Sequence, residues 1–249
     1  MTVKPTFSVE TLTERQIAKA IDHSLLRPEL DDAFVEDGCR LAARYDVASV
    51  CVPPVHVSRA RSILAATDVK VGTVVGFPHG YATTETKVAE TRQALAEGAT
   101  EIDMVIQIGA LKSGRDADVA ADIRAVVEAA HAGGAIVKVI FENAYLSDDE
   151  KIRACRLTEA AGAEFVKTST GFAPTGATHD DLRLMRANTS PHIQVKAAGG
   201  VRTLDALIDV MNLGVTRIGA TATATIVDDF RARKAGRAPL AAAAGDGGY

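Results

Sequence analysis

Eight short runs rich in β-branched residues recur along the chain, and the alanine-rich segments between them are typical of helices. The runs begin at intervals of about 22 to 35 residues and cover residues 21–25, 48–54, 70–78, 100–106, 135–141, 164–171, 193–200 and 216–222. Such alternation predicts βαβ units and a parallel sheet. A doubly wound open sheet usually has fewer strands and often carries a GxGxxG turn, which this sequence lacks. We therefore predict an α/β fold of the closed (β/α)8, or TIM-barrel, type.

An internal repeat indicates how the strands are aligned. Four helical segments end at a glycine and lead directly into an apolar strand, as glycine suits the left-handed position that ends a helix. These glycines are Gly98, Gly133, Gly162 and Gly214. The residues five positions further on are Asp103, Lys138, Lys167 and Gly219. We expect these four positions to share one level of the barrel.

The length of 249 residues suits a single (β/α)8 domain, although length alone would also allow two smaller ones. We expect one barrel domain over residues 1–249, because no second domain is visible in the sequence. A polar N-terminal arm should precede it. From about residue 231 the chain is basic and then low in complexity, which predicts a flexible tail.

Composition narrows the function. A net charge of -4 argues against general nucleic-acid binding, which favours a basic stripe, so we expect a small-molecule partner. No apolar run approaches the length of about 20 residues that crosses a bilayer, and the polar opening residues do not resemble a secretory signal. We expect a cytoplasmic protein that binds no membrane. Cys39, Cys51 and Cys155 should be reduced thiols, and the histidine and cysteine spacings predict no metal site.

Five charged residues stand inside otherwise apolar strands, where lysine and aspartate are seldom buried. They are Asp22, Asp103, Lys138, Lys167 and Lys196. One such lysine could belong to a buried ion pair or reach a barrel rim, but five charges together favour a functional site.

Two of these lysines suit Schiff-base chemistry, which requires an uncharged amine near neutral pH. A free lysine has a pKa of about 10.4, and burial or a neighbouring cation lowers it. Lys167 and Lys196 lie on successive strands and could form such a pair, with one acting as the nucleophile and the other remaining charged. These considerations alone do not decide which of the two lysines is the nucleophile.

The segments VCVPP, VGTVVGFPHG, EIDMVI, EFVKTSTGF, VKAAGGVRT and RIG resemble the deoxyribose-phosphate aldolase family, in the family's order and over nearly the whole chain. The resemblance implies that Lys167 forms the imine, that Lys196 is its acid-base partner and that Asp103 completes the proton shuttle. It implies a lyase of the class I aldolase type, which needs no metal or organic cofactor. The expected reaction is reversible cleavage of 2-deoxy-D-ribose 5-phosphate to D-glyceraldehyde 3-phosphate and acetaldehyde.

The same resemblance implies a substrate pocket around the lysines. Asp22 and Cys51 should line it, although Cys51 could equally be a small core residue. Lys138 should tune or order the site, with a purely structural role as the alternative. Thr170 and Gly171, which follow the Schiff-base lysine, should also bind substrate.

Phosphate should bind to the last two loops of the barrel, where many (β/α)8 enzymes hold it. Gly199 and Gly200 allow close backbone approach, Thr203 is a candidate helix cap, and Thr221 offers a hydroxyl. The chain departs from the family here, because relatives usually have serine at the position of Thr221 and often a second serine at the position of Ala222.

Two further positions vary among relatives. Phe172 stands where some relatives carry a phosphate-contacting lysine, although a branch of the family also has phenylalanine there. Tyr249 could reach the site from a mobile tail or be a frayed chain end.

Two rival functions stay open at the sequence level. A transaldolase-like class I aldolase would share the lysine but accept a larger ketone donor, and a sugar-phosphate sensor would keep the barrel without turnover. A homodimer and a homotetramer are both compatible with the sequence.

Overall fold

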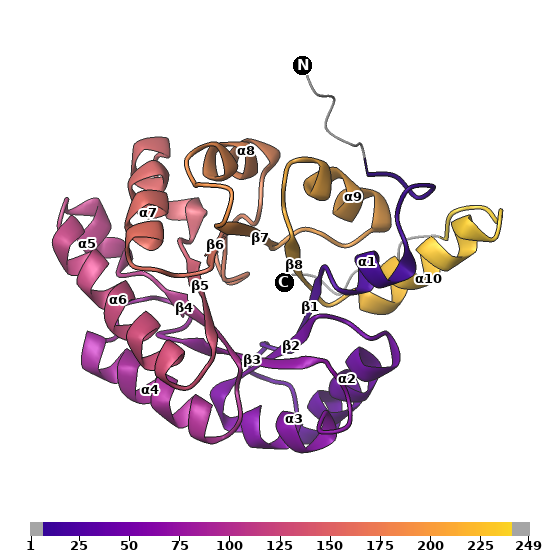
Figure 1. Ribbon diagram of the computed structural model, residues 1–249, viewed down its shortest axis with the longest axis horizontal. Helices are drawn as coiled ribbons and strands as arrows, with labels where there is room; N and C mark the ends of the chain where they lie inside the picture. The colour runs from indigo at the N-terminus through magenta and orange to yellow at the C-terminus, as the bar shows by residue number, and fades with distance from the viewer. Residues whose placement is uncertain (1–6, 241–249) are drawn as a thin grey trace.

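The computed structural model describes residues 7–240, which contain a closed barrel of eight parallel strands. The strands pair in chain order from β1 to β8, and β8 pairs with β1 to close the barrel. The strands lie at the centre of Figure 1, and the helices surround them. The (β/α)8 fold predicted from the sequence is confirmed.

The strands are β1 (Ile21–Ser24), β2 (Ser49–Val52), β3 (Lys70–Val75), β4 (Glu101–Val105), β5 (Ile136–Ile140), β6 (Phe165–Lys167), β7 (Gln194–Ala198) and β8 (Arg217–Ala220). The α-helices are α1 (Glu14–Ala18), α2 (Asp32–Arg44), α3 (Val57–Ile63), α4 (Thr84–Ala96), α5 (Ile108–Lys112), α6 (Asp116–Ala132), α7 (Asp148–Ala160), α8 (His179–Ala187), α9 (Leu204–Asn212) and α10 (Thr223–Lys234). Two short 3-10 helices, η1 (Pro54–His56) and η2 (Asn143–Tyr145), follow β2 and β5.

Hydroxyl side chains fix the start of several helices at the carboxyl end of the barrel. Thr83 accepts a hydrogen bond from the backbone of Thr86 at the start of α4, and Ser147 forms a capping box with Glu150 at the start of α7. Thr203 caps α9, as the sequence predicted. These caps anchor the loops that connect the strands to the helices.

Side chains that point into the barrel form layers of four, each drawn from alternate strands. The observed registers give an upper layer of Cys51, Asp103, Lys167 and Gly219, which lies just below a last layer of Ser24, Val74, Ile140 and Ala198 at the carboxyl ends of the strands. The middle layer contains Asp22, Gly72, Lys138 and Lys196. The lower layer contains Ser49, Glu101, Phe165 and Arg217.

This layering corrects the expectation that four positions share one level. Asp103, Lys167 and Gly219 do share a layer, whereas Lys138 belongs to the layer beneath. The strands tilt around the barrel, so neighbouring strands contribute to alternating layers rather than to one ring. Lys138 is the direct register partner of Asp103 on the next strand.

Most of the predicted glycine turns adopt the expected conformation. Gly98, Gly162 and Gly214 have φ values of 102°, 85° and 93°. The prediction is wrong for Gly133, which caps α6 with φ -99°, because the next residue, Gly134, takes the left-handed conformation with φ 75°. A pair of glycines can place the turn at either residue, and the sequence pattern alone does not say which.

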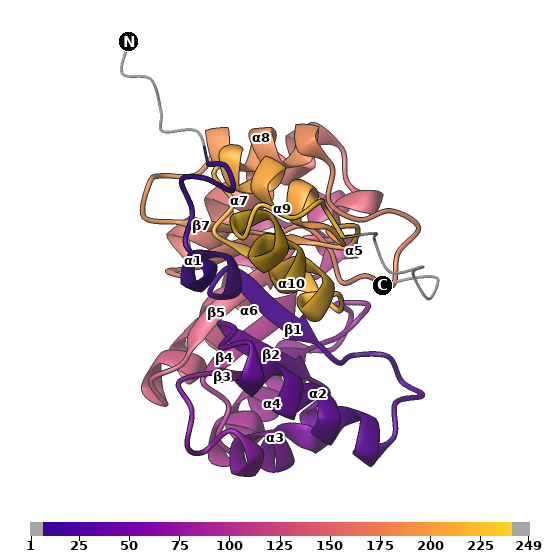
Figure 2. The same ribbon diagram turned by 90° about the vertical axis from the view of Figure 1, so that its right-hand side faces the viewer.

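The ends of the described chain pack on the barrel. The backbone of Phe7 exchanges hydrogen bonds with the side chain of Asn212 at the end of α9, and α1 packs against α10 (Figure 2). Helix α10 continues to Lys234, past the residue where the sequence predicted a tail, and Leu240 N–H donates to Asp229 at 2.8 Å. Tyr249 lies outside the described residues. Within residues 7–240, each helix is too short or too polar to span a bilayer.

Candidate active site

Two of the predicted lysines meet at one carboxylate inside the barrel. Lys167 and Lys196 are register partners on β6 and β7. The Nζ atom of Lys167 lies 2.7 Å from Asp103 Oδ2, and that of Lys196 lies 2.8 Å from the same oxygen. All three side chains are buried. The structure therefore brings together the three residues predicted to carry the chemistry.

Two more predicted residues complete the middle of this cluster. Asp22 Oδ2 lies 2.6 Å from the Nζ atom of Lys196 and 3.2 Å from that of Lys138. Lys138 also lies 3.0 Å from Asp103 Oδ1. Since Asp22 is on β1 and Lys138 is on β5, these contacts cross the interior of the barrel.

Sequence reasoning missed two charged residues in the lower layer. Glu101 Oε2 lies 2.6 Å from the Nζ atom of Lys138, and Glu101 Oε1 lies 3.1 Å from Arg217. Arg217 also pairs with Asp22. A signal for Glu101 was present, because it stands two residues before Asp103 and residues at that spacing on a strand share a face.

The charges in the cluster do not balance if every group is ionised. The cations are Lys138, Lys167, Lys196 and Arg217, and the carboxylates are Asp22, Glu101 and Asp103. Four positive and three negative charges leave one uncompensated positive charge, which is costly to bury.

Lys167 is the member whose charge is least compensated. Among the described residues it pairs only with Asp103, through an oxygen that Lys196 shares, whereas Lys138 contacts three carboxylates. With Lys167 uncharged, three cations face three carboxylates. Lys167 is thus the member of the cluster with the fewest carboxylate contacts, and it lies above Lys138 and Lys196 in the barrel.

The surrounding charges fix the ionisation of the other groups. Burial alone would raise the pKa of Asp103, but Lys138, Lys167 and Lys196 together hold it well below its usual range. The same balance lowers the pKa of Asp22. Burial opposes the charge of Lys138, yet Asp103, Asp22 and Glu101 raise its pKa well above the usual value. Lys138 is thus held as a cation and is unsuited to act as a nucleophile.

Cys51 lies in the same layer as Lys167 and also belongs to a small apolar cluster with Leu26, Val74 and Phe77. Burial, with a smaller effect of Asp103, raises the pKa of the Cys51 thiol to about 11. The thiol is therefore neutral at physiological pH. All three cysteines are buried and free, as expected.

The remaining predicted residues lie in loops at the carboxyl ends of β6, β7 and β8. Thr170 is fully buried, and Gly171 has φ 94°. Gly199 approaches the backbone of Gly176, so that a Cβ atom on Gly199 would lie 2.8 Å from Gly176 Cα. Thr221 is exposed just before α10. All these predicted positions thus surround the mouth above Lys167.

An apolar pair that includes Phe172, and a buried acid that the sequence did not single out, also lie at this mouth. Phe172 packs edge-on against Phe77, with ring centroids 5.4 Å apart. Glu142, directly after Phe141 and buried, accepts hydrogen bonds from Thr170. No strand position or spacing in the sequence distinguished Glu142 as a site residue.

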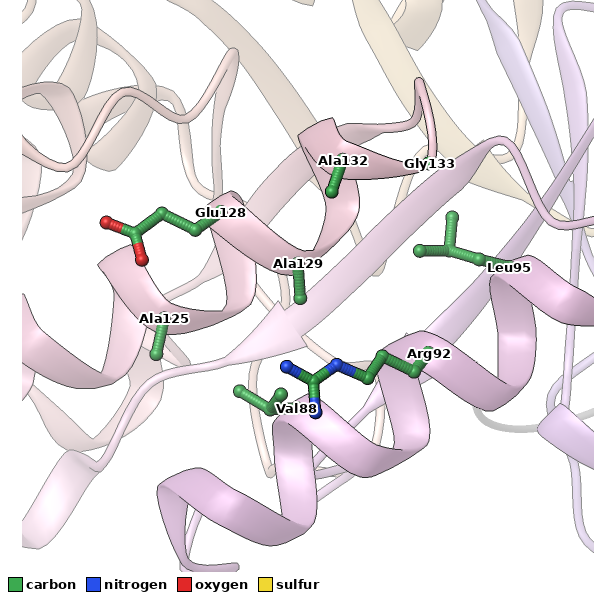
Figure 3. A pocket seen from close by; sticks show the side chains of 8 residues that line it. All are labelled: Val88, Arg92, Leu95, Ala125, Glu128, Ala129, Ala132 and Gly133. Carbon is green, nitrogen blue, oxygen red and sulfur yellow. The ribbon is translucent and has the colours of Figure 1, made fainter.

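Two surface grooves lie apart from the lysine cluster. One, of about 500 Å³, lies between α4 and α6, where Val88 and Leu95 face Ala125 and Ala129 (Figure 3). The other groove, of about 640 Å³, lies between the segments that follow β3 and β4, and His79 is among the residues that line it. Within residues 7–240, His, Cys, Asp and Glu side chains form no group suited to hold a metal ion.

Comparison with known proteins agrees with this geometry. The model of the DeoC/LacD family of aldolases matches residues 16–232. A deoxyribose-phosphate aldolase of Alkaliphilus oremlandii is 51% identical, with 88% of this chain and 99% of that protein covered. Deoxyribose-phosphate aldolase 2 of Bacillus licheniformis is 54% identical, over 85% and 94% of the two chains.

A solved structure gives the same result. The tetrameric deoxyribose phosphate aldolase of Aeropyrum pernix superposes with a TM-score of 0.82 at 28% identity, covering 89% of this chain and 93% of that one. The resemblance inferred from the strand motifs is confirmed. The chain belongs to the DeoC/LacD family of aldolases.

Proposed function

We propose that this protein is a deoxyribose-phosphate aldolase, which reversibly cleaves 2-deoxy-D-ribose 5-phosphate to acetaldehyde and D-glyceraldehyde 3-phosphate. The observation that carries the proposal is the position of Lys167. It is the topmost lysine of a buried cluster with one excess positive charge, and it shares its carboxylate with Lys196. An amine in that setting is suited to attack a carbonyl.

In the proposed reaction, the uncharged amine of Lys167 attacks C1 of the open-chain sugar. The carbinolamine that forms takes up a proton on its hydroxyl and loses water, which leaves a protonated imine. This cation draws electrons from the C2–C3 bond. Removal of the C3 hydroxyl proton then breaks that bond, releasing glyceraldehyde 3-phosphate and leaving an enamine.

Lys196 carries the proton transfers in this scheme, and Asp103, which the resemblance implied to complete the proton shuttle, acts as a fixed anion. Protonated Lys196 can donate to the departing carbinolamine hydroxyl and afterwards accept a proton, directly or through water. Asp103 stays anionic, since three lysines surround it, so it orients both amines and stabilises the protonated imine. Protonation of the enamine at C2, followed by hydrolysis of the imine, releases acetaldehyde and regenerates Lys167.

The phosphate is proposed to bind at the loops that follow β6, β7 and β8. Gly199 and Gly200, with φ values of 79° and 100°, present backbone amides close to the start of α9. Thr221 supplies a hydroxyl at the start of α10, and Thr170 and Gly171 complete the rim. Asp22, Cys51 and Lys138 line or order the pocket beneath the sugar.

The proposal extends to the setting of the enzyme. The lysine itself provides the electron sink, so the chemistry requires no metal or organic cofactor, and chelation should not alter turnover. We infer a cytoplasmic homo-oligomer that acts on small phosphorylated sugars and aldehydes rather than on nucleic acid or membranes. The tetrameric Aeropyrum pernix relative supports an oligomer, and sedimentation of the purified protein tests it.

Reductive trapping tests the proposal directly. The enzyme is treated with acetaldehyde and borohydride, digested and analysed by mass spectrometry, and the reduced adduct is expected on Lys167. An adduct on Lys196 would reverse the two lysine roles, and no lysine adduct would rule out the Schiff base. Assays with acetaldehyde and with a ketone donor separate the proposed enzyme from a transaldolase-like one, and no turnover would favour a sensor.

A further inference from the structure

Glu142 is a buried acid that the proposed reaction does not use. It lies just beyond β5, is 2% exposed and has a left-handed backbone conformation with φ 58° and ψ 64°. Among the described non-glycine residues, only Glu142 and Asp46 have positive φ. Such a conformation is unfavourable for a side chain longer than asparagine and persists where surrounding contacts enforce it.

The contacts of Glu142 converge on the loop that follows Lys167. Glu142 Oε1 accepts a hydrogen bond of 3.2 Å from Thr170 N–H, and Oε2 accepts one from the Thr170 hydroxyl. The Thr170 hydroxyl oxygen in turn accepts from Phe172 N–H at 3.0 Å. One carboxylate thus fixes the backbone from Thr170 to Phe172.

The backbone on either side of this contact is tied to the nucleophile. Phe141 N–H donates to the carbonyl of Lys167 at 3.0 Å, and Asn143 N–H donates to the carbonyl of Thr168 at 3.0 Å. Glu142 therefore stands between two bonds that hold the end of β5 to β6. A shift of its side chain would act on the loop that carries Thr170 rather than on Lys167 itself.

We propose that Glu142 is a positioning residue that acts through Thr170 and holds residues 170–172 in the conformation that receives the phosphorylated substrate. This inference rests on the proposed function. The carboxylate form matters, because two oxygens accept from one threonine, and a protonated carboxyl would turn one acceptor into a donor.

The ionisation of Glu142 gives the inference a pH signature. Burial raises the pKa of Glu142, while its bonds to Thr170 and the charges of Lys167 and His79 act in the opposite direction. Because the pKa is raised, the carboxylate is lost, as pH falls, at a higher pH than that of an ordinary glutamate. Substrate affinity should weaken as the Glu142 carboxylate is protonated.

The test compares wild type with Glu142→Gln, whose amide keeps the shape but mimics the protonated acid. At neutral pH we expect KM for deoxyribose 5-phosphate to rise about tenfold, with kcat changed by less than about twofold, as for the weakening of a hydrogen bond to a charged group. The ratio of the two KM values should fall towards one as pH is lowered. Ionisation of the substrate phosphate cancels in this ratio.

A second variant at the same contact and a surface glutamate supply the matched controls. Thr170→Val should raise KM as Glu142→Gln does, whereas Glu128→Gln, on the exposed face of α6, should behave as wild type. The double variant Glu142→Gln/Thr170→Val should have a KM no higher than that of Thr170→Val, since both substitutions break the same contact. Additive effects, a KM ratio independent of pH, or a loss confined to kcat would each overturn the inference.

A substrate-free measurement separates this inference from the proposed function. If Glu142 holds the loop, backbone amides of Thr170 and Phe172 should exchange with solvent at least about tenfold faster in Glu142→Gln than in wild type. Unchanged exchange would refute the positioning role even if the enzyme is active. Wild type without turnover would instead refute the proposed function, and the exchange result would still decide whether Glu142 holds the loop.

Discussion

Lys167 and Lys196 are register partners on neighbouring strands, and their amines lie 2.7 and 2.8 Å from the same oxygen of Asp103. Two amines that share one anion cannot both be fully compensated in a buried site. Lys196 has a second carboxylate partner, because Asp22 lies 2.6 Å from its amine, whereas Lys167 has only Asp103 among the described residues. This asymmetry supports the different roles that we propose for two otherwise similar residues.

For Lys196→Met, we expect kcat to fall by about a thousandfold or more while the barrel stays folded. The substitution removes both the amine that shares Asp103 with Lys167 and the proposed proton carrier. Turnover at neutral pH and a circular dichroism spectrum check the two parts. Lys112→Met, on the exposed surface of α5, should leave kcat unchanged, and near-normal turnover of Lys196→Met would refute the pairing.

For Asp103→Asn, we expect turnover to collapse while substrate binding is largely kept, because the anion that orients both amines is removed. The loss also removes one of the three carboxylates that face the cations of the cluster, so the free energy of unfolding should fall by about 3 kcal/mol. Steady-state kinetics and urea unfolding measure the two effects. A variant with normal kcat and a raised KM would instead give Asp103 a binding role.

Acid should destabilise the barrel through Asp22 and Asp103, whose pKa values lie below the ordinary range in the folded protein. The stability they contribute is present above the unfolded-state pKa of about 3.9 and is lost as pH falls towards the folded values. Urea unfolding between about pH 5 and pH 2 should show this loss. The loss of stability on acidification should be smaller in Asp103→Asn than in wild type, and it should be unchanged in the surface control Asp149→Asn.

Ala222→Ser tests the phosphate loop after β8. Ala222 is the N-cap residue of α10 and makes no side-chain capping bond. A serine hydroxyl there should lower KM for deoxyribose 5-phosphate by about tenfold and leave turnover of unphosphorylated deoxyribose nearly unchanged. An equal response of both substrates, or of neither, would place the phosphate elsewhere.

A second buried ion pair allows a prediction about stability alone. Lys87 Nζ on α4 lies 2.6 Å from Asp122 Oδ2 on α6 and donates to the carbonyl of Val105 at 2.8 Å. Lys87→Met should lower the free energy of unfolding by about 3 to 5 kcal/mol, since it leaves the buried carboxylate of Asp122 without a cation. Lys87→Met with Asp122→Leu should recover part of that loss. A Lys87→Met protein with wild-type stability would show that the pair is dispensable.

The charged core of the site is predictable because burial of lysine and aspartate in apolar strands is rare. Lys138, Lys167 and Asp103 stand out for that reason. Glu101 and Arg217 do not, because each opens its strand, where a polar residue commonly faces solvent. The spacing of Glu101 from Asp103 indicates a shared face, but only the closed register shows that Glu101 and Arg217 meet beneath Lys138.

Loop residues are harder to predict than strand residues. The hydrophobic runs extend beyond the strands, as in residues 164–171, because the loop residues Thr168 and Thr170 are as buried as the strand itself. Burial therefore does not mark where the strand ends. Glu142 shows the limit most clearly, since its role depends on a left-handed backbone and on a threonine 28 residues away.

The close approach of Gly176 and Gly199 matters for engineering. The loop after β6 lies directly on the loop after β7, and Ala177 N–H donates to the carbonyls of both Ala198 and Gly199. With no room for a side chain at either glycine, a substitution there would force the two loops apart. A mutant library aimed at new acceptor aldehydes should keep these two positions fixed and diversify Phe77 and Phe172, whose ring contact is separate from the contact between the glycines.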